Sequence, residues 1–232
     1  LGQAMQESHP ETAVVYTSAF EQGGDVDAAP LVYPGDEDLA ALQLTSGTTG
    51  FPRVCVWDQN AVLQALHGME LAMKLGEGDV CVNWTPLYHD MGLIGAWFGS
   101  MYFAVPVLIM SPLTFLADPA RWLWAIHHYR ATITAAPNFA YELCLKNIRD
   151  EDIQGLDLSS LRMMLNGEEP VSPNTISRFA ERFNPFGLAA SAIMPVYGLA
   201  ESSVGLTFPP LSRGPLIDRI ERATFMNSGR AE

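Results

Sequence analysis

The feature that most constrains the fold of this chain is the regular alternation of short apolar runs with helical patterns. The helical pattern after Asp58 is the clearest, because its apolar residues from Val62 to Met73 recur at helical spacing. Strands are expected at residues 42–46, 53–57, 80–84, 105–110, 131–135, 161–165 and 193–197. Further helices are expected after Asp90, at 118–128 and 138–147, and from Ser172. Alternation at this spacing predicts an α/β fold of parallel-rich layered sheets with helices on their faces.

Composition limits the function. The chain has 232 residues, 48% of them hydrophobic, so it is long enough to bury one sizeable core. Its 26 acidic and 13 basic side chains give a net charge of −13, which argues against a nucleic-acid partner but leaves a nucleotide ligand open. Its 3 cysteines and 5 histidines show no metal-ligand spacing, and residues 1–30 contain no signal peptide. A cytoplasmic protein without zinc is expected.

Residues 91–117 contain no charged side chain and could suggest a membrane span. Glycines and prolines interrupt this stretch, and no cluster of basic residues flanks it. We therefore expect a buried helix followed by a buried strand, and no transmembrane segment. A membrane-embedded protein is the alternative.

Residues 45–50 consist of threonine, serine and glycine and follow a predicted strand. Glycine lets the backbone approach a ligand closely, while the hydroxyl groups and Arg53 can bind phosphate oxygens. A flexible linker would have a similar composition. Three other unusual loops, at 86–92, 166–170 and 197–201, also follow predicted strands. Because ligands of open α/β sheets bind beyond the carboxyl ends of the strands, we expect the four loops to form one site.

These motifs resemble those of the adenylate-forming (AMP-binding) superfamily. Residues 44–53 (LTSGTTGFPR) are similar to its phosphate-loop signature, and residues 196–201 (VYGLAE) to its later nucleotide-site motif. Residues 88–95 (YHDMGLIG), 166–170 (NGEEP) and 194–197 (MPVY) resemble the branch of fatty acyl-AMP ligases and long-chain acyl-CoA synthetases. The resemblance runs from about Leu39 onward. It implies that 1–232 is part of an AMP-binding domain, that 1–38 is a peripheral segment, and that the C-terminal lid domain is absent.

The resemblance also implies roles for particular residues. His89, Glu201 and Arg53 would be catalytic, and Glu201 would bind Mg²⁺ together with the Thr45 hydroxyl. Tyr197 would stack on adenine, and His89 would lie near the α-phosphate or the substrate carboxylate. The nucleotide-binding residues would be Thr45, Ser46, Gly47, Thr48, Thr49, Gly50, Arg53, Asn166, Gly167, Glu168, Glu169, Pro170, Tyr197, Gly198 and Glu201.

Two positions depart from the pattern of this superfamily. Arg53 stands where a lysine is usual, and it keeps the positive charge while offering phosphate a forked donor. Glu168 stands where a small residue is common, so its side chain must point away from the nucleotide or find a partner. The uncharged residues 91–110 would help to line an apolar acyl tunnel, although core packing explains them equally well.

The activity implied is that of a ligase. It would activate a fatty acid with ATP and Mg²⁺ to an acyl-adenylate, release pyrophosphate, and pass the acyl group to the thiol of an acyl carrier protein or coenzyme A. Because the lid and its lysine would be missing, we expect the 232 residues alone to have little or no activity. The alternative is a non-catalytic nucleotide- or acyl-binding module.

Overall fold

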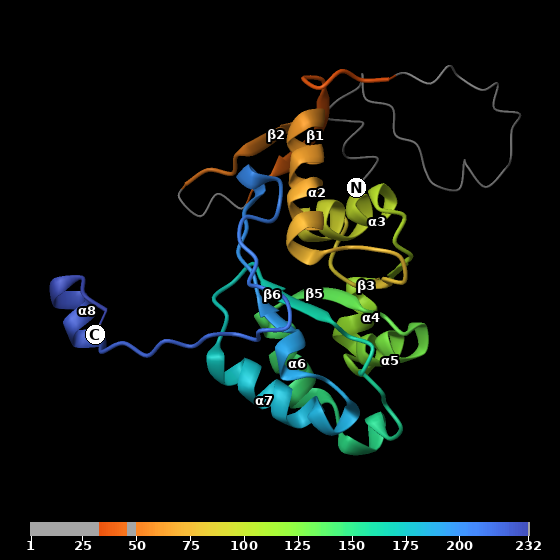
Figure 1. The fold of residues 1–232 in the computed structure, drawn as a ribbon, viewed down its shortest axis with the longest axis vertical. Helices are drawn as coiled ribbons and strands as arrows, with labels where there is room; N and C mark the ends of the chain where they lie inside the picture. The colour runs from red at the N-terminus through yellow and green to blue at the C-terminus, as the bar shows by residue number, and fades with distance from the viewer. Residues whose placement is uncertain (1–32, 46–49, 232) are drawn as a thin grey trace, which may run out of the picture. The chain divides into compact units, whose positions relative to one another are not determined.

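The computed structural model describes residues 33–45 and 50–231. The chain divides into two units, Leu1–Pro34 and Gly35–Glu232, and every element described below belongs to the second. Figure 1 labels its principal helices and strands.

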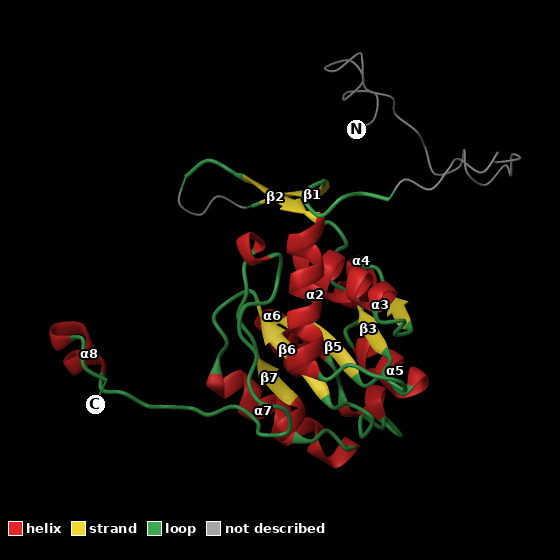
Figure 2. Ribbon diagram, turned by 45° about the horizontal axis from the view of Figure 1, so that its top comes forward, coloured by secondary structure: helices red, strands yellow, loops and turns green. Residues whose placement is uncertain are grey.

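A five-stranded parallel sheet forms the centre of the fold, with the strand order β4-β3-β5-β6-β7 (Figure 2). The strands are β3 (Cys81–Asn83), β4 (Val107–Ile109), β5 (Ile133–Pro137), β6 (Met163–Gly167) and β7 (Ile193–Pro195). The longest ladder joins β5 to β6, from Ile133 opposite Met163 to Pro137 opposite Gly167. All five strands were expected near these positions, and the parallel α/β sheet confirms the predicted fold class.

Helices cover both faces of this sheet. Side chains alternate between the two faces along a strand, so Met163 and Leu165 of β6 pack with Met69 and Met73 of α2 (Gln59–Met73), while Met164 faces the other way. On that opposite side the core contains large side chains from α5 (Ala120–Tyr129), α6 (Asn138–Asn147) and α7 (Pro173–Phe183). Helices α6 and α7 begin as predicted, with the Ser172 hydroxyl accepting a hydrogen bond from the Thr175 amide.

Two strands lie outside the central sheet. β1 (Leu39–Leu44) and β2 (Val54–Asp58) form an antiparallel hairpin in which Leu44 is opposite Val54. Strands were expected close to both positions. The hairpin loop, however, was expected at the end of a strand of the same sheet as the other three loops, and that was wrong: the loop joins two strands of a separate two-stranded sheet. Asp58 ends β2 and caps α2 by accepting a hydrogen bond from the amide of Ala61 at 2.6 Å.

The uncharged stretch is broken into short pieces. Its first piece is a π-helix, η2 (Met91–Phe98), which runs into α3 (Gly99–Tyr102); β4 and α4 (Pro112–Ala117) follow. We did not predict the π-helix or α4. Short turns complete the chain: η3 (Asp150–Ile153), η4 (Asn184–Phe186), η5 (Ala190–Ala192), η6 (Ala200–Ser202) and α8 (Arg222–Ser228). Within residues 33–45 and 50–231, no helix is long and apolar enough to cross a membrane.

Candidate functional site

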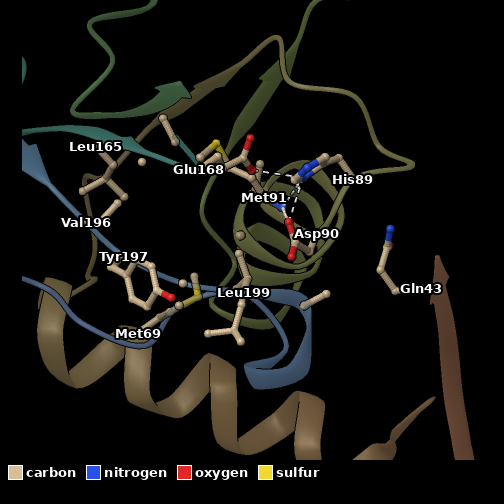
Figure 3. A pocket seen from close by; sticks show the side chains of 18 of the residues that line it. Gln43, Met69, His89, Asp90, Met91, Leu165, Glu168, Val196, Tyr197 and Leu199 are labelled. Carbon is tan, nitrogen blue, oxygen red and sulfur yellow. Dashed lines mark hydrogen bonds and ion pairs between the residues drawn. The ribbon is translucent and has the colours of Figure 1, made fainter. Parts of the chain in front are cut away.

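A cavity of about 580 Å³ lies on the α2 side of the sheet (Figure 3). All four loops singled out in the sequence contribute described residues to its wall: Thr45 from the hairpin, His89 to Met91 from the loop after β3, Gly167 and Glu168 from the end of β6, and Tyr197 to Glu201 after β7. The prediction that these loops converge on one site is therefore correct. A cavity of this size falls in the range that small-molecule ligands occupy.

The hairpin brings Thr45 and Arg53 to this wall. The Thr45 amide donates a hydrogen bond to the Arg53 carbonyl oxygen at 2.8 Å, and the Thr45 hydroxyl reaches the same oxygen at 3.3 Å. These bonds close the base of the loop, so the two side chains lie at its two ends. Gly50 is described but does not line the cavity. The predicted phosphate-binding residues Ser46, Gly47, Thr48 and Thr49 lie outside the described residues.

His89 is held by two carboxylates. Its Nδ1 lies 2.7 Å from Oδ1 of Asp90 and 3.0 Å from Oε1 of Glu168 (Figure 3). Hydrogen bonds from Asp90 and then Glu168, opposed by partial burial, raise the pKa of His89 to about 10. The ring is therefore an imidazolium at neutral pH, with a proton on each nitrogen. The Met91 amide also binds Oδ1 of Asp90, at 2.7 Å, so Asp90 is fixed to the start of η2.

The motif at 166–170 divides between the cavity and the core. Gly167 and Glu168 line the wall, whereas Asn166, Glu169 and Pro170 do not. Asn166 is fully buried, and its amide nitrogen lies 3.4 Å from Oδ1 of Asn138. The Glu169 carboxylate accepts a hydrogen bond from the Phe139 amide at 2.5 Å and so binds the first turn of α6.

Gly167 is needed for close packing of two strand ends. A Cβ atom at this position would lie 2.9 Å from the Val196 carbonyl oxygen, closer than real side chains approach backbone oxygen. The next residue, Glu168, has a φ of 71°, in the left-handed region that few residues other than glycine adopt. This turn sends the Glu168 side chain toward His89.

The segment after β7 is folded back on itself. The backbone of Tyr197 pairs with Thr207, and a Cβ atom at Gly198 would overlap the Val204 carbonyl oxygen. The Tyr197 ring lines the cavity and keeps 61% of its surface exposed, which leaves a face free for a planar ligand. Glu201 follows in η6, where it is exposed and also lines the cavity.

The charged side chains of the described wall are Arg53, His89, Asp90, Glu168 and Glu201. His89, Asp90 and Glu168 bind one another, so the imidazolium charge is balanced within the protein and the cluster keeps one net negative charge. Each of these three residues has an atom that could bind a metal ion, and these atoms lie within 4.8 Å of one another. The hydrogen bonds between the imidazolium and the two carboxylates explain these short distances, so we assign no metal to the cluster. The Thr45 hydroxyl and the Glu201 carboxylate are oxygen groups of the kind that Mg²⁺ prefers, and both line the cavity.

A family model described as AMP-binding enzyme matches residues 3–226 of this sequence. The chain belongs to the AMP-binding enzyme family. It is 38% identical to the medium-chain-fatty-acid–[acyl-carrier-protein] ligase TtuA of Teredinibacter turnerae, over 72% of this chain and 26% of that protein. The chain spans between 26% and 35% of the length of the first curated relatives that it matches.

Solved structures of AMP-binding enzymes agree with this assignment. One, from a study of fatty acyl-adenylate ligases of E. coli and L. pneumophila, aligns over 99% of this chain and 42% of its own with a TM-score of 0.92 and 34% identity. Another is the fatty acyl-adenylate ligase of L. pneumophila in complex with acyl adenylate and pyrophosphate; it aligns over 82% of this chain and 34% of its own, with a TM-score of 0.77 and 35% identity. The resemblance inferred from the sequence motifs is thus confirmed.

Most of the apolar residues that line the cavity of this AMP-binding enzyme were not identified from the sequence. Met69 and Met73 of α2 were identified only as one helical face, with no sign that part of this face would border a cavity. Gln43 was also missed: its side-chain amide donates a hydrogen bond to the Tyr88 carbonyl oxygen at 3.2 Å and connects β1 to the His89 loop. The remaining apolar residues of the wall include Ile133, Ala135, Leu165, Val196, Val204 and Phe208.

Proposed function

We propose that this chain is part of an AMP-binding domain whose whole protein activates a fatty-acid carboxylate with ATP. The carboxylate oxygen attacks the α-phosphorus of ATP. The bond between the α-phosphorus and the oxygen that bridges the α- and β-phosphates breaks, so acyl-adenylate and pyrophosphate form. The observation that carries this proposal is the single cavity to which all four motif loops contribute. Such a reaction needs positioning and charge stabilisation more than proton transfer, and the wall offers groups for both.

Arg53 and Thr45 are proposed to bind the departing phosphates together with the rest of the loop between β1 and β2. They stand at the two ends of this loop, and the hydrogen bonds between them hold its base closed. A guanidinium group can donate two parallel hydrogen bonds to phosphate oxygens, which suits the charge that develops on pyrophosphate.

The nucleotide base is proposed to lie between Tyr197 and the end of β6. The exposed Tyr197 ring offers a stacking surface, and the lack of a side chain at Gly167 lets the end of β6 pack closely against Val196 beside it. Gly198 belongs to the same wall. Glu169 and Asn166, which point into the α6 side, would support this wall rather than touch the base.

His89 is proposed to bind the acidic end of the acyl substrate or the α-phosphate. Its ring is charged at neutral pH, and its Nδ1 is engaged by Asp90 and Glu168. The Nε2–H group therefore remains to donate to an oxygen of the ligand. In this role His89 orients the ligand by a hydrogen bond and does not transfer a proton.

Glu201 and Thr45 are proposed to hold Mg²⁺. The carboxylate and the hydroxyl both line the cavity and are hard oxygen donors, so the residues present fit this ion. When bound, Mg²⁺ would neutralise phosphate charge as pyrophosphate leaves.

The apolar wall is proposed to receive the acyl chain. Met69 and Met73 of α2 line the main cavity together with Gly95 and Ala96 of η2, and both methionines and Gly95 also line a smaller cavity of about 20 Å³. We propose the thiol of an acyl carrier protein or coenzyme A as the acceptor, with preference for the carrier protein. The cytoplasm, where ATP and coenzyme A are available, is the proposed location.

The test is pyrophosphate exchange by the whole protein, scanned across fatty and aryl acids. ATP-dependent exchange with fatty acids is the expected result, with thioester formed when a carrier protein or coenzyme A is added. Nucleotide binding without exchange for any acid would contradict an enzymatic role and favour a non-catalytic binding module.

A further inference from the structure

Glu168 is the residue of the cavity that the family pattern does not explain, because small residues are common at this position. It adopts a left-handed backbone conformation, with a φ of 71°. Its neighbour Glu169 uses its carboxylate on the other side, at the start of α6. Two successive glutamates therefore point to different parts of the molecule, and only Glu168 reaches the cavity wall.

The Glu168 carboxylate lies beside the His89 ring at the cavity wall. The two residues come from different elements, the end of β6 and the loop before η2, and Oε1 lies 3.0 Å from Nδ1 (Figure 3). Asp90 holds the same ring nitrogen from its own side at 2.7 Å, and is itself fixed by the Met91 amide. With one carboxylate on its own loop and a second from the end of β6, the ring has little freedom to turn about its side-chain bonds.

We propose that Glu168 is a positioning residue for His89: with Asp90 it holds the imidazolium ring so that the remaining N–H group faces the acidic end of the substrate. This inference rests on the proposed function, in which His89 binds that acidic end. The other charged groups of the described wall are Arg53 and Glu201. Without Glu168, the ring would keep a single carboxylate partner and would lose both orientation and part of its hold on the proton.

The test compares Glu168→Gln and Glu168→Ala with Glu181→Gln in the whole protein. Glu181 is an exposed carboxylate of α7 away from the cavity wall, so its replacement controls for lost negative charge. In pyrophosphate exchange, both Glu168 variants are expected to lower kcat/KM for the fatty acid by about tenfold at neutral pH, the size of one coupled contact. The deficit should grow above about pH 8, where an imidazolium with one carboxylate fewer loses its proton first.

A double-mutant cycle separates positioning from a general structural role. In a His89→Gln background, Glu168→Gln should have no further effect, because the side chain that it positions is gone. If Glu168→Gln reduces exchange equally with and without His89, or leaves the pH profile unchanged, the positioning role is overturned.

Histidine NMR on the same proteins distinguishes failure of this inference from failure of the proposed function. The His89 resonance, assigned by its loss in His89→Gln, should titrate at lower pH in Glu168→Gln than in the unmodified protein, and this readout needs no activity. An unchanged His89 titration would overturn the inference even if exchange is robust. A shifted titration in a protein that exchanges no pyrophosphate would support the contact and overturn the proposed function.

Discussion

The indole nitrogen of Trp57 donates a hydrogen bond to the carbonyl oxygen of Ala200 at 2.7 Å, between residues 143 positions apart in the chain. Trp57 lies on β2 and is only 2% exposed, whereas Ala200 begins the η6 turn that carries Glu201. A partly buried hydrogen bond therefore connects the hairpin that bears Thr45 and Arg53 to the turn that bears the proposed magnesium ligand. Removing the donor of such a bond leaves the carbonyl oxygen without this partner, which lowers the free energy of unfolding.

Trp57→Phe should weaken this connection while keeping an aromatic ring in the core. The Ala200 carbonyl would lose its partner, at a cost of about 1 to 3 kcal/mol in the free energy of unfolding. Denaturant unfolding measures that loss. Pyrophosphate exchange by the whole protein should fall through a higher KM for ATP, because the two halves of the phosphate site are less firmly held together. Exchange at the unmodified rate and KM would show that this bond supports stability alone.

Arg53→Ala should reduce pyrophosphate exchange by about 1 to 3 kcal/mol of transition-state stabilisation, as expected for a lost charge-assisted contact. Arg53→Lys is the matched control, because it keeps a positive charge at the position where the superfamily usually has lysine. The lysine variant should retain most of the activity that the alanine variant loses. If the alanine variant exchanges pyrophosphate normally, Arg53 does not belong to the site.

Replacing glycine with alanine should lower the stability of the fold at Gly92 and raise it at Gly68. In Gly92→Ala, the new Cβ would lie 2.2 Å from the Pro86 carbonyl oxygen, so the loop before η2 must shift, and a loss of about 1 to 3 kcal/mol in stability is expected. In Gly68→Ala, on an exposed part of α2, nothing lies within 4 Å, and removing glycine from a helix should gain about 0.5 to 1 kcal/mol. Thermal unfolding of the two variants checks both signs.

His89 should make the stability of the fold depend on alkaline pH. Its pKa is about 10 in the folded protein against 6.5 for a free histidine, so the folded state binds the proton more tightly. The resulting stabilisation is fully present below pH 6.5, declines between the two values, and is lost above about pH 10. The free energies of denaturant unfolding of the unmodified protein and of His89→Gln should therefore differ most just below pH 6.5 and least above about pH 10. A difference that does not shrink as the pH rises would contradict the charged pairing.

Much of the fold could be predicted because its signals are local. Asp58 and Ser172 each precede a helical pattern, and the structure shows both side chains accepting hydrogen bonds from the first turn. The short apolar runs correspond to strands since a parallel sheet covered on both faces leaves few polar positions. Three of the four loops reach the cavity from the ends of β3, β6 and β7, as the rule for parallel sheets predicts, whereas the fourth reaches it from the separate hairpin.

The parts that could not be predicted depend on tertiary contacts. The π-helix at Met91–Phe98 has a slightly wider turn than an α-helix. The spacing of apolar residues in the sequence does not distinguish the two kinds of helix. The separate hairpin sheet depends on how β2 packs through Trp57, not on its own pattern. The partner of Glu168 could not be named either, because the left-handed turn that aims it at His89 is unusual for glutamate.

Gly95→Leu should shift the whole protein toward shorter acyl substrates. Gly95 borders both the main cavity and the small cavity beside it, and its nearest neighbour, Val204, would lie 4.0 Å from an added Cβ atom. Alanine therefore fits without displacement, whereas leucine would occupy space that we assign to the acyl chain. With Gly95→Leu, kcat/KM for long-chain acids should fall about tenfold or more relative to short-chain acids, while Gly95→Ala changes this ratio little. Equal effects on all chain lengths would place the acyl chain elsewhere.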